Sequence, residues 1–573
     1  MKFWRKSALI APAVIVAMTA AACGGGSGSG GGDNAGGTQQ GGRMVFGLND
    51  SIPDNLYPNI TAGNLVSTQY VETRALLAPF RVYPDFTVKA DTDFMVGEPT
   101  SEVTGGKQVI TYKINPKAVW SDGTAVSAKD FTYTWQSQKS SDPKAGGCAA
   151  LLSTTGYEDI ASIEPADNDK TVTVTMSKPF GDWKNLFNPV YPQHILDKGS
   201  PTANCTAINK GWPTSEGLPV SDGPFVLEKA GIDVNKKIMT MTRNPKWWGT
   251  PAKLDTVIVQ SIGNDPAVIV SAMRNNEVQM IYPQPQLDLV KQIKSLEPTV
   301  TSQTNFGLSF EHLDFNTKDA FLAQKEVRQA FAWGLNRPDI VAKTVGQFDS
   351  RAQVLNNRYY TNGQPQYKDN SGGQYGTQNV QKAQQLLESA GFTRGTDGIY
   401  AKGGKRLSLQ IMTTQNNPLR SNTIDVITQQ EKQVGIEVKK FLNADIFAGP
   451  EKPTSLIGGQ YQIALFAWVA APFITQNASI YATPKGDAIG QNYTRQGDPR
   501  VDPLLAQINT STEDAKTAEL GNQVDTYLWD DMLTIPLYQK PDFSAINSQY
   551  TGFVDNPTQY GPLWDLASIA KKK

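Results

Sequence analysis

The chain has 573 residues, of which 39% are hydrophobic, and its 53 Lys and Arg against 54 Asp and Glu give a formal net charge of -1. This near-neutral balance lacks the basic excess that attracts phosphate backbones, so we expect no nucleic-acid partner. The length exceeds what one hydrophobic core usually supports, so two or three lobes are expected.

The first 22 residues have the layout of a secretory signal. Lys2, Arg5 and Lys6 precede an uncharged, mostly apolar stretch that ends in three alanines directly before Cys23. The apolar stretch is shorter than the roughly 20 residues that span a bilayer. The pattern resembles a bacterial lipobox, although Ala20 stands where Leu is more common. We predict a signal peptide over 1–22 and a lipid on Cys23; the alternative is an ordinary cleaved signal that leaves a stray thiol.

The following segment, 23–42, is almost wholly Gly, Ser, Asn, Thr and Gln after the cysteine. Such a composition buries no apolar surface and predicts a flexible linker. About 20 flexible residues have a root-mean-square reach of roughly 25 Å, enough to hold a folded body clear of a membrane. Without residues 1–22 the chain keeps 50 basic against 54 acidic residues.

Two cysteines, Cys148 and Cys205, remain once Cys23 is set aside. An even pair in an oxidising compartment predicts a disulfide. The alternative is a pair of buried free thiols.

Hydrophobic patterns along the chain indicate a mixed α/β protein. Strands are expected at 109–114 and 407–413, and helices at 325–335 and 380–390. The longest apolar run, 463–474, is too short to cross a bilayer and contains a proline, so it predicts a buried strand that runs into a loop.

The residues offer little to catalysis. His194 and His312 are the only histidines, each without a nearby Cys or second His, and the usual zinc and nucleophile motifs are absent. The adjacent acids Asp530 and Asp531 point in different directions on a helix and indicate a solvated face. We therefore expect no enzyme activity, no metal and no cofactor.

The stretch W-S-D-G-T-A-V-S-A-K-D-F over 120–131 closely resembles the signature of the peptide and dipeptide class of ABC-importer substrate-binding proteins. Its residues predict a turn at 121–123 and a helix that Ser127 caps, with Asp130 completing a near capping box. The motif is therefore structural and is not a ligand site.

Further landmarks of this class follow in order along nearly the whole chain after the linker. They include 48–58, Asp222-Gly223-Pro224-Phe225, 243–249, 327–331 and 435–438. The chain is thus identified by resemblance as a family 5 extracellular solute-binding protein in lipoprotein form.

The resemblance implies an α/β, two-lobed periplasmic-binding-protein-like fold with an extra third lobe and a ligand cleft at the hinge. Mapped onto this chain, the hinge lobe takes 43–73, 215–307 and 535–573, the extra lobe 74–214, and the second large lobe 308–534. Ligand contacts to both large lobes would favour the closed form that a permease recognises.

Eight candidate ligand contacts follow from the same mapping, and for each one alone a packing role is about as common. They are Asn49, Asp50, Tyr57, Gln415, Asn416, Trp468, Val469 and Tyr493. Trp468 is the strongest, because an aromatic ring at the end of a strand can stack on a peptide backbone, a sugar or a ring.

One departure bears on the solute. Peptide binders of this family usually carry an aspartate after the strand that ends here at Trp468, where it pairs with the peptide's amino terminus. This chain has Val-Ala-Ala-Pro-Phe over 469–473. A buried ammonium without a counter-charge costs several kcal/mol. Either another acid such as Asp50 substitutes, or the ligand is not a free-amine peptide.

The resemblance implies a monomeric substrate-binding lipoprotein on the extracytoplasmic face of the bacterial cell membrane. It would capture peptides or a related small solute and deliver them to the permease and ATPase subunits of an ABC importer. The alternative is an envelope lipoprotein of the same fold that regulates or scaffolds without transport. An extracellular hydrolase has no residues to support it, and two isolated histidines do not favour nickel or haem capture.

Overall fold

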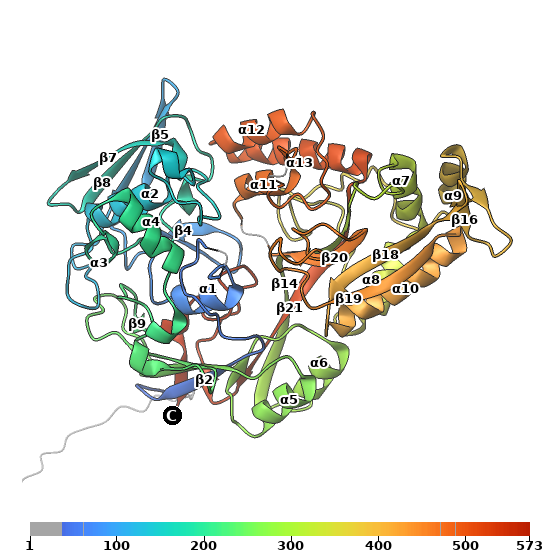
Figure 1. Cartoon of the computed structure of the whole chain (residues 1–573). Coiled ribbons are helices and arrows are strands. Elements are labelled where there is room, and N and C mark those ends of the chain that lie inside the picture. The colour runs from blue at the N-terminus through green and yellow to red at the C-terminus, as the bar shows by residue number, and fades with distance from the viewer. Residues whose placement is uncertain (1–36, 61, 470–471, 487–488) are drawn as a thin grey trace, which may run out of the picture.

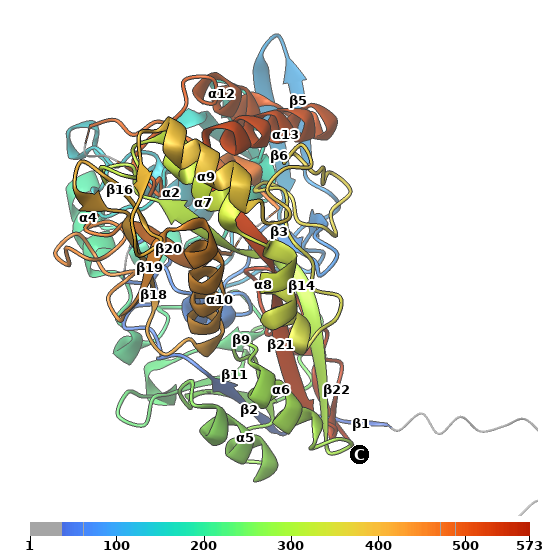
Figure 2. The same cartoon turned by 90° about the vertical axis from the view of Figure 1, so that its right-hand side faces the viewer.

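Two long antiparallel strands, β14 (Val300–Phe315) and β21 (Thr534–Asn547), run through the middle of the molecule and connect its two halves (Figures 1 and 2). The computed structural model describes residues 37–60, 62–469, 472–486 and 489–573. The pairing of β14 and β21 is irregular between Phe306 and Phe310 and again between Glu311 and His312. These irregularities bend the pair where it passes from one half to the other.

A single large sheet extends to both sides of this crossing pair, in the order β10-β11-β12-β2-β13-β21-β14-β20-β18-β19. On one side lie β10 (Ile232–Asp233), β11 (Ile238–Arg243), β12 (Thr256–Ser261), β2 (Arg43–Leu48) and β13 (Met280–Ile281). On the other side lie β20 (Ile463–Trp468), β18 (Ser408–Thr414) and β19 (Glu437–Asn443). The strands β18, β19 and β20 are parallel, so their carboxyl ends meet at one edge.

The half that contains β2, here called the first lobe, is built on two hydrophobic cores. Helices α5 (Pro266–Arg274) and α6 (Leu287–Lys294) cover one face of its sheet. The larger core continues without interruption into a four-stranded sheet with α2 against it. Those elements are β5 (Thr100–Thr104), β6 (Lys107–Lys113), β8 (Thr171–Met176), β7 (Ile160–Ala166) and α2 (Ala128–Gln138).

The signature stretch at 120–131 forms the predicted turn and helix start. Gly123 has φ +96°, and Ser127 is the cap of α2. The Ser127 side chain accepts from the backbone N–H of Lys129, and its own N–H donates to Asp130 at 2.8 Å. Trp120 is fully buried. The capping-box prediction is confirmed, and the motif is a packing element of the first lobe.

The half that contains β18 and β20, here called the second lobe, has a separate core. Four helices contribute to it: α7 (Lys325–Gly334), α8 (Arg337–Lys343), α9 (Val380–Ser389) and α10 (Pro418–Val434). A cap above it holds α11 (Ala478–Tyr481), α12 (Asp502–Thr510) and α13 (Asp514–Asp531) (Figure 1). The predicted helices at 325–335 and 380–390 and the predicted strand at 407–413 are confirmed to within one residue at each end.

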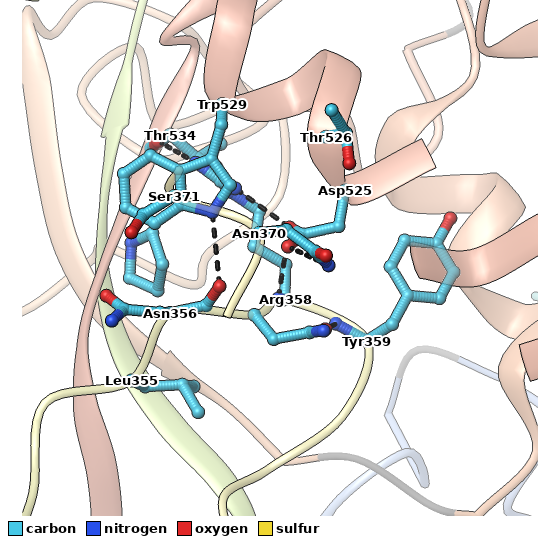
Figure 3. A network of polar contacts seen from close by, with 12 residues as sticks. Leu355, Asn356, Arg358, Tyr359, Asn370, Ser371, Asp525, Thr526, Trp529 and Thr534 are labelled. Atoms are coloured by element: carbon cyan, nitrogen blue, oxygen red, sulfur yellow. Dashed lines mark hydrogen bonds and ion pairs between the residues drawn. The ribbon is translucent and has the colours of Figure 1, made fainter. Parts of the chain in front are cut away.

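A buried ion pair fastens this cap to the crossing strands (Figure 3). Arg358 donates to Asp525 of α13 at 2.8 Å and to the backbone oxygen of Thr534 on β21 at 2.6 Å. Its guanidinium also lies 4.4 Å from the ring centroid of Trp529. The other oxygen of Asp525 accepts from Asn370 at 3.0 Å. Because each donor and acceptor is engaged, we interpret this network as structural.

The ordered part begins earlier than the sequence predicts. The short strand β1 (Thr38–Gln39) pairs with β23 (Ala570–Lys572) at the C-terminus, and Gly41 donates to Lys253. The predicted linker over 23–42 is therefore too long at its C-terminal end, because its last residues obtain backbone partners. The signal peptide and Cys23 lie outside the described residues.

A disulfide joins Cys148 to Cys205 within the first lobe. Cys205 lies in α4 (Pro201–Lys210), which is thereby fastened to the loop that follows α2. Among the described residues, no helix has the length and apolar character needed to cross a membrane.

Candidate ligand site at the junction of the two lobes

Trp468, the last residue of β20, lies in a cluster of aromatic rings. Its ring plane is nearly parallel to those of His312 and Tyr493, at centroid distances of 5.7 and 5.9 Å and angles of 11° and 8°. Phe466 meets the Trp468 ring edge-on at 5.2 Å. These neighbours hold the half-buried indole in one orientation at the carboxyl edge of the sheet. Two predicted ligand contacts, Trp468 and Tyr493, are thus brought together.

His312 is a member of this cluster that the sequence reasoning set aside as isolated. It lies on β14 directly opposite Phe466 of β20, and only 1% of it is exposed. Its Nε2 lies 3.3 Å from Asp314. The sequence does contain one indication of this role: several polar residues, His312 among them, stand in the stretch that forms the central strand β14, where they are buried. Polar residues are unusual in a central strand.

The second strand end at this edge carries Gln415 and Asn416, which form the turn between β18 and α10. Both side chains are exposed, and Asn416 has φ +60°. Arg420, in the first turn of α10, forms a buried bidentate ion pair with Glu311 of β14 at 3.0 Å and also donates to Thr414. This ion pair fixes the turn against the crossing strand.

Of the remaining predicted ligand contacts, some are exposed and one is buried. Val469 is 46% exposed, and Asn49 and Asp50 follow the end of β2 with Asp50 exposed. The structure does not support the predicted ligand contact of Tyr57. Only 3% of this residue is exposed, and its ring packs at 5.2 Å on Tyr191 and 4.9 Å on Trp212. The turn at 56–58 directs its side chain into the core of the first lobe, so Tyr57 is a packing residue here.

Acidic groups gather beside the crossing strands on the first-lobe side. Burial raises the pKa of Asp555 to about 7, and one of its oxygens accepts from Asn305 at 2.5 Å. Burial also raises the pKa of Asp542, which lies near Tyr282. The charges of Asp542, Asp555 and Asp50 all raise the pKa of Tyr70, although burial is the larger cause, so these acids surround one tyrosine.

Beyond the crossing strands, the two lobes also touch each other directly. The backbone N–H of Thr475 in the second lobe donates to Asp182 of the first at 2.8 Å, and Gly181 donates to the backbone of Asn509 at 2.9 Å. Phe473 packs in a small apolar cluster with Val82, Tyr560 and Trp564. The two lobes are therefore in direct contact in this structure. Burial in this contact raises the pKa of Asp182 to about 6.

A cavity of about 470 Å³ lies elsewhere, at the amino ends of β18 and β20. Its lining includes Ser408, Gln410, Lys439 and Gln462. Ligands of open α/β sheets bind at carboxyl ends of the strands, so we place the candidate site at Trp468 and not in this cavity. In the described part of the chain, no group of three or more His, Cys, Asp or Glu is arranged to hold a metal ion.

A two-lobed fold hinged on two crossing strands, with aromatic residues at the strand ends that face the hinge, defines the class of periplasmic solute receptors. The profile of the family described as "Bacterial extracellular solute-binding proteins, family 5 Middle" matches residues 97–488. The chain belongs to this family.

Similar proteins have varied ligands in their names. The oligopeptide-binding protein OppA of Mycobacterium tuberculosis is 28% identical over 519 residues, which cover 90% of this chain and 83% of OppA. The probable monoacyl phosphatidylinositol tetramannoside-binding protein LpqW of M. tuberculosis is 25% identical over 395 residues, 63% of this chain and 59% of LpqW. An uncharacterized lipoprotein of the same organism is 24% identical, with 84% of this chain and 85% of that protein covered.

Solved structures agree on the fold. The periplasmic EDTA-binding protein EppA has a TM-score of 0.85 at 25% identity, covering 94% of this chain and 98% of its own. The oligopeptide-binding protein AppA from Bacillus subtilis, solved with a nonapeptide, has a TM-score of 0.75 at 20% identity, covering 94% and 100%. The predicted two-lobed α/β fold and the family are confirmed.

Proposed function

We propose that this solute-binding protein captures peptides outside the cell and delivers them to the permease of an ABC importer. The observation that supports this most is the pair of half-buried rings, Trp468 and Tyr493, which lie beside the hinge and are held in place by the buried His312. Rings held in a fixed orientation offer apolar area and edges to a peptide without selecting one side chain. OppA, whose match covers 90% of this chain, is named an oligopeptide-binding protein.

A peptide amine needs a counter-charge, and the aspartate expected after Trp468 is absent from the sequence. The acids beside Tyr70 supply an alternative: Asp50, Asp542 and Asp555 lie across the junction on the first-lobe side. Asp555 keeps one buried oxygen without a hydrogen-bond partner among the described residues. An ammonium placed there would satisfy that oxygen and would lower the pKa of Asp555. This arrangement supports a free-amine ligand.

Closure is the proposed working motion. The contacts of Asp182 with Thr475, and of Phe473 with its apolar partners, exist only when the lobes meet. A ligand that touches both lobes adds its binding free energy to this state, and the permease then reads the closed form. No covalent step is needed, so we propose a monomeric receptor without enzyme activity.

Attachment to the outer face of the membrane through a lipid on Cys23 is part of the proposal. The cysteine follows a signal-like segment and precedes a Gly-rich stretch that continues to the ordered strand at Thr38. A relative that matches this chain over 85% of the relative's own length is named a lipoprotein. The division into three lobes also stays a prediction: a hinge lobe of 43–73, 215–307 and 535–573, an extra lobe of 74–214, and a second large lobe of 308–534.

Native mass spectrometry tests the function. A soluble form beginning at Gly37, which keeps the β1–β23 pairing, would be purified gently and then denatured so that a released molecule can be identified. A ladder of short peptides is the expected result. A single glycan, lipid or other compound would keep the receptor and change the substrate class. No released molecule, together with no thermal shift against peptide libraries, would contradict peptide capture.

One observation favours a second candidate. LpqW, whose name contains a mannosylated lipid, matches this chain over 395 residues. A form of this fold that senses an envelope glycolipid and needs no permease would release such a lipid in the same experiment. Its cellular test is peptide uptake, which would be unchanged when the chain is deleted.

A further inference from the structure

Lys540 is a buried cation without a partner on the crossing strand β21. Only 5% of the residue is exposed, and no hydrogen bond or ion pair joins it to the residues that the structure describes. Its Nζ is not among the fully enclosed atoms that lack a partner, so the ammonium can still be reached from outside. An ammonium that is largely removed from water and has no partner is unfavourable in a folded protein. Such a cost persists in a folded protein where the charge serves binding or catalysis.

The acids near Lys540 do not neutralise it by direct contact. Glu311 is engaged by Arg420, whose Nε donates to both carboxylate oxygens at 3.1 and 3.0 Å and whose Nη2 donates to one of them at 3.0 Å. Asp542 lies two residues along the same strand and forms no ion pair with Lys540 within 4.0 Å. Burial lowers the pKa of Lys540, while Asp542 and Glu311 oppose this shift.

Lys540 also lies at the hinge. Its neighbours Gln539 and Pro541 pair with Phe310 and Phe306, the two residues that flank the irregularity in β14. Gln539 closes this irregularity by donating to the backbone oxygen of Gly307 at 2.6 Å. Lys540 therefore lies between the acids beside Tyr70 and the ion pair that fixes the turn at 415–417.

We infer that Lys540 binds a carboxylate of the captured ligand, at the point where the two lobes are joined. The inference rests on the proposed function, because the ligand is taken to be a peptide. A carboxylate is the group that matches a compact ammonium by a charge-assisted hydrogen bond. It comes either from the C-terminus of the peptide or from an Asp or Glu side chain.

The test uses Lys540→Met, which keeps the length of the side chain and removes the charge, with Lys291→Met on the exposed face of α6 as the matched control. Three pentapeptide libraries are compared: free C-terminus without Asp or Glu, amidated without Asp or Glu, and amidated with one Glu. The native protein should prefer the first or third library over the second by at least tenfold. Lys540→Met should abolish that preference, and Lys291→Met should keep it.

Other results overturn the inference. Equal binding of all three libraries by the native protein, or a preference that survives in Lys540→Met, would show that Lys540 holds no ligand carboxylate. A native protein that binds none of the libraries would reject peptide capture itself, and the inference with it.

Thermal stability separates binding from a structural role. If Lys540 serves the ligand, removing its charge from the ligand-free protein relieves an unfavourable burial, so the melting temperature of Lys540→Met should stay equal or rise. A melting temperature that falls by several degrees would assign Lys540 to the fold and would contradict the inference.

Discussion

Replacing Trp468 by alanine is expected to weaken ligand binding at least tenfold while changing stability little. The indole packs on His312 and Tyr493 and is half-buried, so part of it remains free for a ligand. Phe466 adds a third, edge-on contact, and the three ring contacts are worth about 0.5–1.5 kcal/mol each beyond their buried area, in both the free and the bound protein. Their loss lowers the free energy of unfolding by about 3 kcal/mol.

That loss translates into a small thermal shift, because a folded body of about 530 residues has a large unfolding entropy. At about 2.1 cal/mol/K per residue the melting temperature should fall by about 3 °C. Lost ligand contact adds separately to the binding free energy, and a tenfold change corresponds to about 1.4 kcal/mol. Affinity and stability are thus predicted to respond on different scales.

The assay is isothermal titration of the molecule that native mass spectrometry identifies. Trp333→Ala is the matched control, since Trp333 is also half-buried and packs on Tyr375 at 4.7 Å, in the core of the second lobe and away from the aromatic cluster. It should lose similar stability and keep full affinity. Trp468→Phe should recover part of the affinity. Unchanged affinity in Trp468→Ala would remove this residue from the ligand site and refute the reasoning.

Three further predictions concern closure, the first lobe and the anchor. The raised pKa of Asp182, about 6 in the closed form, means that closure favours the protonated acid; ligand affinity should therefore fall as pH rises from 5 to 7, by at most about tenfold, and Asp182→Asn should flatten this dependence. A dependence equal in both proteins would assign it to another group. Cys148→Ser should lower the stability of the first lobe by about 4 kcal/mol in denaturant titrations, because the disulfide closes a loop with a sequence separation of 57 residues; equal midpoints would contradict this. Cys23→Ser should move the protein from the membrane fraction to the medium, and retention on membranes would reject the lipid anchor.

Local elements were predictable where short-range chemistry decides them. The cap of α2 depends on Ser127 and Asp130, three residues apart, and it forms as the sequence predicts. The helix α9 ends at Ser389, two residues before Gly391, which has φ +83°. Such signals act within one turn of chain, so no knowledge of the tertiary fold is needed to interpret them.

The site was less predictable because it depends on contacts between distant segments. His312 looks isolated in the sequence, yet β14 places it opposite Phe466. Tyr57 occupies a turn that resembles the family's ligand-facing segment, but packing against Tyr191 turns its side chain inward. Lys540 lies in a strand that is buried along nearly its whole length, so no alternation of polar and apolar residues marks its position.

The pairing of β1 with β23 brings both ends of the folded body to one place, at the base of the first lobe (Figure 1). With the proposed lipid on Cys23, only this lobe is tied to the membrane, and the second lobe is connected to it through the crossing strands. The anchored first lobe then stays in place relative to the membrane, and closure moves the second lobe without stretching the linker. The signal of a fluorophore at the C-terminus would report the distance to the bilayer and would not change when ligand binds. The signal of a fluorophore on α9 would change when the lobes close.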